Sequence, residues 1–120
     1  MQQKFEAAGY PVAAPCLRFH DQARPPAALG TTGLADYAAD LEEEIGHMGE
    51  APIVVGHSMG GLLALQLASR VSVRALILLA PSAPWGIPPT TLFEIGAAQA
   101  MHLRPGYWNM VLEPSRDVAL

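Results

Sequence analysis

The sequence VVGHSMGG, at residues 54–61, places the motif Gly-x-Ser-x-Gly between two apolar segments of different character. The β-branched residues 53–55 before the motif favour a buried strand, and the leucine-rich residues 62–69 after it favour a buried helix. A strand that turns into a helix within so few residues leaves Ser58 at the apex of the turn. The sequence therefore predicts that the Ser58 hydroxyl lies over the carboxyl edge of a sheet, where open α/β sheets bind ligands.

The predicted turn limits what the residues around Ser58 can do. A side chain at Gly56 or Gly60 is expected to collide with the neighbouring helix or strand, so both positions must be small. The following helix directs its N-terminus at the site, and the Met59 backbone N–H is expected to be one donor to a developing oxyanion. His57 is adjacent to Ser58, but adjacent side chains diverge on so sharp a turn. His57 is therefore expected to pack rather than to act as a base.

The rest of the chain predicts alternating strands and helices. Predicted strands lie at residues 10–14, 53–55 and 73–79, and predicted helices lie at residues 2–9, 34–48, 62–69 and 91–102. Thr32 is expected to cap the second helix, and Asp36 complements the dipole at its N-terminus. This alternation favours a parallel sheet with right-handed crossovers and with helices covering both faces.

Composition limits the class of protein. A length of 120 residues with 51% hydrophobic residues suits one modest globular domain. The formal net charge is −4 and no basic residues cluster, so no nucleic-acid partner is expected, and the acidic residues read as a solvated helix face. Cys16 is the single cysteine, which excludes an intrachain disulfide and fits a reducing, cytoplasmic compartment. No signal peptide and no apolar run of roughly 18 residues is found, so no membrane span is expected.

The motif and its flanks resemble the α/β-hydrolase superfamily, especially its esterase, lipase and cofactor-free peroxidase-like members. Gly56, His57, Gly60 and Gly61 surround Ser58 as in that family's nucleophile elbow. The resemblance continues on both sides of the motif. Residues 8–15 resemble the family's fourth strand, residues 17–21 the loop after it, and residues 76–81 the strand after the elbow helix.

The resemblance implies an α/β fold. Residues 1–82 are expected to form the central part of a three-layer hydrolase core, with three parallel strands and flanking helices, and residues 83–120 to begin a helical cap. The resemblance also implies that Ser58 is the catalytic nucleophile, that Met59 supplies an oxyanion donor, and that no cofactor takes part. The expected partner is a small acyl substrate, whose identity the sequence does not specify.

Several parts of the family's machinery are not recognised in this sequence. The resemblance implies a second oxyanion donor before residue 1, and an acid and a histidine on loops after later strands. Glu94, His102, Glu113 and Asp117 are the candidates within the chain, and none follows a predicted strand. The chain is therefore expected to be a truncated hydrolase that lacks its first strands and its C-terminal acid and histidine. Strand edges left open by the missing neighbours are expected to promote self-association.

Other residues carry weaker signals. His20 and His47 are expected at the surface, and Cys16 has no histidine context that favours a nucleophile. The 4 histidines and the cysteine show no metal-ligand spacing, so no metal is expected. Three functions remain open: a serine hydrolase that forms a Ser58 acyl-enzyme, a catalytically silent fragment or interaction protein, and a cofactor-free peroxidase or carbon–carbon bond hydrolase.

Overall fold

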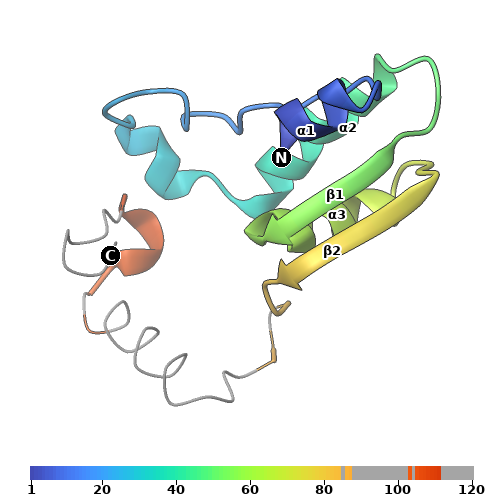
Figure 1. Ribbon diagram of the computed structural model, residues 1–120. Coiled ribbons are helices and arrows are strands. Elements are labelled where there is room, and N and C mark those ends of the chain that lie inside the picture. Colours follow the sequence, from blue (N-terminus) through green and yellow to red (C-terminus); the bar gives the residue numbers. More distant parts are fainter. Residues whose placement is uncertain (85, 88–102, 104, 112–120) are drawn as a thin grey trace.

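The computed structural model describes residues 1–84, 86–87, 103 and 105–111, and Figure 1 shows their arrangement. The elements in chain order are α1 (Gln2–Ala7), η1 (Ala27–Thr31), α2 (Leu34–Gly46), β1 (Ile53–Ser58), α3 (Met59–Ala68), β2 (Ala75–Pro81) and η2 (Tyr107–Asn109). The predicted helix at residues 91–102 lies outside the described residues. No described helix is long and apolar enough to cross a membrane.

The centre of the fold is the predicted strand–turn–helix–strand unit. β1 and β2 pair in parallel, from Ile53 opposite Ala75 to His57 opposite Leu79, and α3 connects them. α3 packs against both strands, and its buried residues are Gly61, Leu63, Ala64 and Leu67. The structure thus confirms that the β-branched run is a strand and that the leucine-rich run is a buried helix.

α2 packs beside α3 and completes the small core. Tyr37 and Ala38 of α2 are buried together with Leu63 of α3. Around this cluster pack partly buried leucines from α2 itself, from η1 and from the loop before η1: Leu17, Leu29, Leu34 and Leu41. The face of α2 that carries these apolar residues is therefore the face that joins it to the elbow helix.

The predicted strand at residues 10–14 is wrong, because the structure has no strand there and its described sheet is two-stranded. The turn after α1 has Gly9 at φ +86°, and the Tyr10 N–H donates to the Phe5 carbonyl oxygen at 3.1 Å. Pro11 and Pro15 have no N–H to give to a ladder. The prolines and this local turn therefore leave the segment with little reason to pair as a strand.

The prediction that helices cover both faces of the sheet is also wrong for the described part of the chain. Side chains alternate between faces along a strand, and α3 covers the face that carries buried Gly56. The opposite face exposes Ile53 (53%), Val55 (38%), Ile77 (45%) and Leu79 (38%). β1 also pairs with no strand other than β2 among the described residues. Self-association through this open edge stays a prediction.

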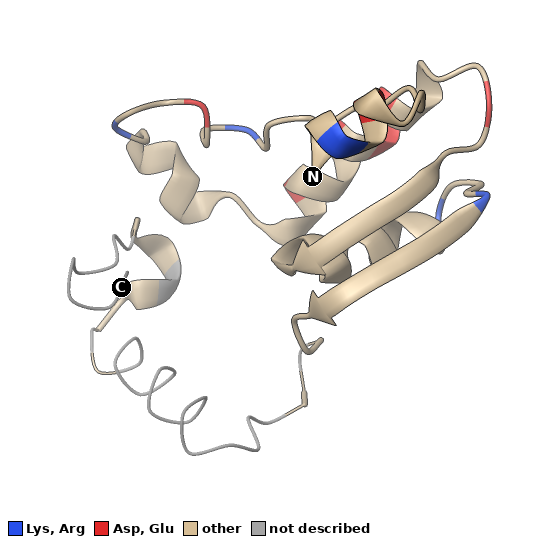
Figure 2. Ribbon diagram, in the orientation of Figure 1, with Lys and Arg blue, Asp and Glu red and all other residues tan. Residues whose placement is uncertain are grey.

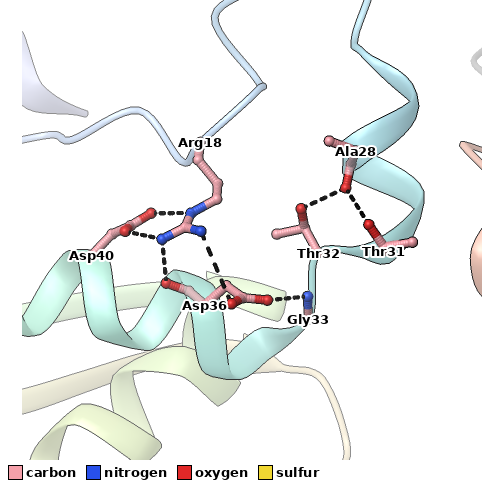
Figure 3. A network of polar contacts seen from close by, with 7 residues as sticks. All are labelled: Arg18, Ala28, Thr31, Thr32, Gly33, Asp36 and Asp40. Carbon is pink, nitrogen blue, oxygen red and sulfur yellow. Dashed lines mark hydrogen bonds and ion pairs between the residues drawn. The ribbon is translucent and has the colours of Figure 1, made fainter.

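The start of α2 differs from the predicted cap. The Thr32 hydroxyl donates to the Ala28 carbonyl oxygen at 2.8 Å, inside η1, rather than capping the helix (Figure 3). Gly33 is the N-cap residue, and its backbone N–H donates to the Asp36 carboxylate at 2.8 Å. Asp36 therefore does two things: its charge lies in the first turn of the helix and its side chain closes that turn.

An arginine clamp fixes the loop before η1 to α2 (Figure 3). The Arg18 guanidinium forms a two-point ion pair with Asp40, with the Nε donating at 2.6 Å, and it also donates to the Asp36 carbonyl oxygen at 3.3 Å. The hydrogen bond from Arg18 lowers the pKa of the Asp40 carboxyl group. Figure 2 shows the acidic residues along α2, and Glu42 also pairs with Arg70 at 2.8 Å. Part of the predicted solvated face is thus ion-paired.

The later part of the chain returns to η1. η2 contacts η1, and a Cβ built on Gly30 would lie 2.7 Å from the Asn109 carbonyl oxygen. Glycine at this position is what allows the two backbones to approach so closely. The division of the chain at residue 82 into a core and a cap stays a prediction.

Candidate active site

Ser58 lies at the junction of β1 and α3, in a backbone conformation that a serine rarely adopts. Its φ is +52° and its ψ is −122°, and it is the N-cap residue of α3. A non-glycine residue held at positive φ costs on the order of 1–3 kcal/mol and persists only where the surrounding structure imposes it. Such strain is what a sharp strand-to-helix elbow places on its central residue. The exposed Ser58 therefore has the backbone geometry that the sequence predicted.

Two glycines make this turn possible. One is Gly56, as predicted, and the other is Gly61 in place of the predicted Gly60. A Cβ on Gly56 would clash with the Gly60 carbonyl oxygen and lie 2.8 Å from the Gly61 Cα. A Cβ on Gly61 would lie 2.7 Å from the Pro81 Cβ. A Cβ on Gly60 would meet no atom of the described residues within 4 Å, so the predicted collision with the neighbouring helix or strand is wrong. The close approach falls on Gly61 because that residue, and not Gly60, faces the end of β2.

A β-bulge at the end of β2 brings a second hydroxyl to Ser58. The register shifts between His57 and Ser58, so that Ser58 pairs with Pro81 and Ala80 is the extra residue, at φ +41°. The Ser82 N–H then donates to the Ser58 carbonyl oxygen at 2.9 Å. The Oγ atoms of Ser58 and Ser82 lie 3.4 Å apart.

Sequence reasoning missed Ser82. The signal was present, because neighbouring parallel strands end at the same edge of a sheet, and Ser82 directly follows the strand predicted beside Ser58. The bulge that brings Ser82 close has no sequence signature, since alanine is not a residue that favours positive φ.

Met59 is the first residue of α3, and its side chain is exposed. The first backbone N–H groups of a helix have no intrahelical acceptor, and no side chain of the described residues caps this end. The positive end of the α3 dipole therefore lies at Ser58. This arrangement favours negative charge next to the hydroxyl.

His57 does not have the packing role that was predicted for it. It is exposed on the sheet face that α3 leaves uncovered, opposite Leu79. Strand alternation points it away from the covered face. Within the described ranges, Ser82 is the hydrogen-bond partner found for Ser58 Oγ, and no histidine or carboxylate bonds to it. The candidates Glu94, His102, Glu113 and Asp117 lie outside the described residues.

The remaining candidates lie away from Ser58. His20 is exposed, and its Nε2 lies 3.2 Å from the Tyr37 hydroxyl oxygen on α2. His47 is exposed just after α2, and Cys16 is a free, exposed thiol. A search of the described part of the chain finds no group of three or more residues that could hold a metal ion.

Comparison with known families identifies the family to which this chain belongs. The sequence profile of the Alpha/beta hydrolase family matches residues 3–119. The chain belongs to the alpha/beta hydrolase family. This membership and the parallel sheet with flanking helices confirm the predicted α/β fold class. Comparison with curated proteins and with solved structures gives no match.

Proposed function

We propose that this alpha/beta hydrolase is a serine hydrolase that cleaves an ester, thioester or related acyl compound through a Ser58 acyl-enzyme. One observation supports this most strongly: Ser58 is held at φ +52° between β1 and α3. Ser58 is also the N-cap residue of α3, next to the positive end of the helix dipole. A chance Gly-x-Ser-x-Gly turn would not need such a conformation.

The proposed reaction has two halves. Ser58 Oγ attacks the acyl carbonyl carbon, its proton passes to a general base, and the alcohol or thiol leaves with a proton. Water then hydrolyses the acyl-enzyme, which releases the acid and restores the hydroxyl. The Met59 N–H and the α3 dipole stabilise the oxyanion in both halves, and one such donor is typically worth about 3–4 kcal/mol of barrier. The base is not among the described neighbours of Ser58.

A fluorophosphonate probe tests this proposal, because it phosphonylates activated serines. The full chain is expected to be labelled at Ser58, and the Ser58→Ala variant is expected to lose labelling. Ser72→Ala is a matched control, because Ser72 is an exposed serine far along the chain from the elbow, and this variant is expected to label as the parent does.

The outcomes separate the alternatives. Equal labelling of the parent and the Ser58→Ala variant would show that the reactive group is elsewhere. Absence of labelling in a folded parent chain would contradict the proposal and favour the catalytically silent alternative. No observation on the described residues favours the peroxidase or the carbon–carbon bond hydrolase over acyl transfer.

A further inference from the structure

We propose that Ser82 is a positioning residue for Ser58, and that the bulge at Ala80 brings the Ser82 hydroxyl to Ser58. The inference rests on the proposed function, in which Ser58 is the nucleophile. Its basis is geometric: the two hydroxyl oxygens lie 3.4 Å apart, and Ser82 is the hydrogen-bond partner found for Ser58 Oγ among the described residues.

Backbone strain is concentrated at the contact between Ser58 and Ser82. Three non-glycine residues have positive φ in the described structure: Phe19, Ser58 and Ala80. Two of the three lie at this junction, at the carboxyl ends of adjacent strands. Bulges re-aim side chains and recur next to active sites, and strained residues persist only where the structure around them imposes the conformation. The structure around Ala80 therefore imposes this conformation, at the same edge of the sheet as Ser58.

The bulge has two direct consequences for the elbow. It sets Pro81 opposite Ser58 and against Gly61, where the Pro81 Cβ lies 2.7 Å from the position of a Cβ on Gly61. It also anchors the next residue, because the Ser82 N–H donates to the Ser58 carbonyl oxygen at 2.9 Å. The Ser82 hydroxyl is thus attached to a backbone that is itself bonded to the nucleophile residue.

The chemistry of a hydroxyl defines what Ser82 does. A serine hydroxyl donates one hydrogen bond and accepts two, and it is too weak a base to take the Ser58 proton at neutral pH. Without a partner, the Ser58 Oγ is free to visit three staggered χ1 positions. A hydrogen bond to a fixed neighbour favours one of them. Ser82 therefore acts through Ser58, by holding the nucleophile in one rotamer.

The experiment uses the matched variants Ser82→Thr and Ser82→Val in the full chain. Threonine keeps the hydroxyl and valine replaces it by a methyl group of the same shape, and Ser82→Ala guards against a steric effect of the added methyl group. Two readouts are taken: the three-bond Hα–Hβ couplings of Ser58 by NMR, which report its χ1, and the rate of fluorophosphonate labelling across probe concentrations.

We expect the valine and alanine variants to show averaged Ser58 couplings, while the threonine variant keeps those of the parent. The saturating labelling rate is expected to fall roughly threefold to tenfold without the hydroxyl, which is the effect of one lost neutral hydrogen bond. The half-saturating probe concentration should stay unchanged, because Ser82 is expected to act on the nucleophile rather than on probe binding.

The couplings decide the inference independently of activity. Ser58 couplings that are identical in the valine and threonine variants would overturn it, whatever the labelling rates. A parent chain that is not labelled would contradict the proposed hydrolase, and the couplings would still support or refute the positioning role of Ser82. Equal labelling of both variants by an active parent would also overturn it.

Discussion

Replacing Gly61 by alanine tests whether the contact between the elbow helix and the end of β2 has the tightness that the structure gives it. Gly61 is buried in the first turn of α3, and an added Cβ would lie 2.7 Å from the Cβ and 2.9 Å from the Cα of Pro81. Ordinary contacts of this kind are 3.4–4 Å, so the two segments must separate by several tenths of an ångström. Pro81 cannot rotate away, because both atoms belong to its ring.

The expected magnitude follows from two opposing effects. Overpacking of a well-packed site typically costs about 1–3 kcal/mol, whereas glycine to alanine in a helix stabilises by up to about 1 kcal/mol. Gly61→Ala is therefore expected to lower the free energy of unfolding by about 1–2 kcal/mol. Gly60→Ala is the matched control, because it lies one residue earlier in the same helix and its Cβ would meet nothing within 4 Å. It should raise that free energy by roughly 0.5 kcal/mol.

Urea unfolding followed by circular dichroism measures both variants. With a slope of about 1 kcal/mol per molar urea for a small chain, the two midpoints should differ by roughly 2 M, with the parent between them. Equal midpoints for Gly60→Ala and Gly61→Ala would refute the reasoning, because the two substitutions differ only in what the added methyl group touches. A less stable Gly60→Ala variant would refute the assignment of the close approach to Gly61.

Two further predictions concern regions away from the elbow. Arg18 lowers the pKa of Asp40, so the contribution of the carboxylate to stability is complete above its ordinary pKa of about 3.8 and is lost as the pH falls through the lower folded value. Asp40→Asn should therefore destabilise the chain near neutral pH and flatten the acid limb of its stability profile; an unchanged acid limb would contradict this. Val55→Lys puts a charge on the open face of edge strand β1 and is expected to reduce self-association, measured by sedimentation against concentration. An unchanged distribution would show that association, if present, uses another surface.

The elbow requires fewer parts of the fold than the reactivity of Ser58 does. The fold needs only the local unit of β1, α3 and β2 to place Ser58 at the sheet edge. Reactivity also needs a base, which the family supplies from other parts of its fold. Labelling of the Ser58 and Ser82 variants therefore tests the reactivity of the Ser58 hydroxyl. The free energies of unfolding of the Gly60 and Gly61 variants test the packing of the elbow.

Features that depend on neighbouring residues could be predicted from the sequence. A β-branched run, a glycine-flanked serine and a leucine-rich run specify a strand, a turn and a helix within about 15 residues, so Ser58 was placed at the elbow from its motif alone. The helix predicted at residues 34–48 is α2 in the structure. Local rules also misjudged some details, since Thr32 bonds within η1 and Gly33 takes the cap position.

Features that depend on contacts between separate elements are set by tertiary packing. Residues 10–14 resemble a strand locally, but a strand exists only where another backbone accepts its hydrogen bonds, and no segment among the described residues does so. Whether Gly60 or Gly61 is crowded depends on the position of Pro81, about 20 residues later. The approach of Ser82 to Ser58 depends on a bulge that shifts the register of β2 by one residue. Contacts of this kind are set by how β1, β2 and α3 pack against one another, and rules that assign each strand, turn or helix from its own residues do not contain that packing.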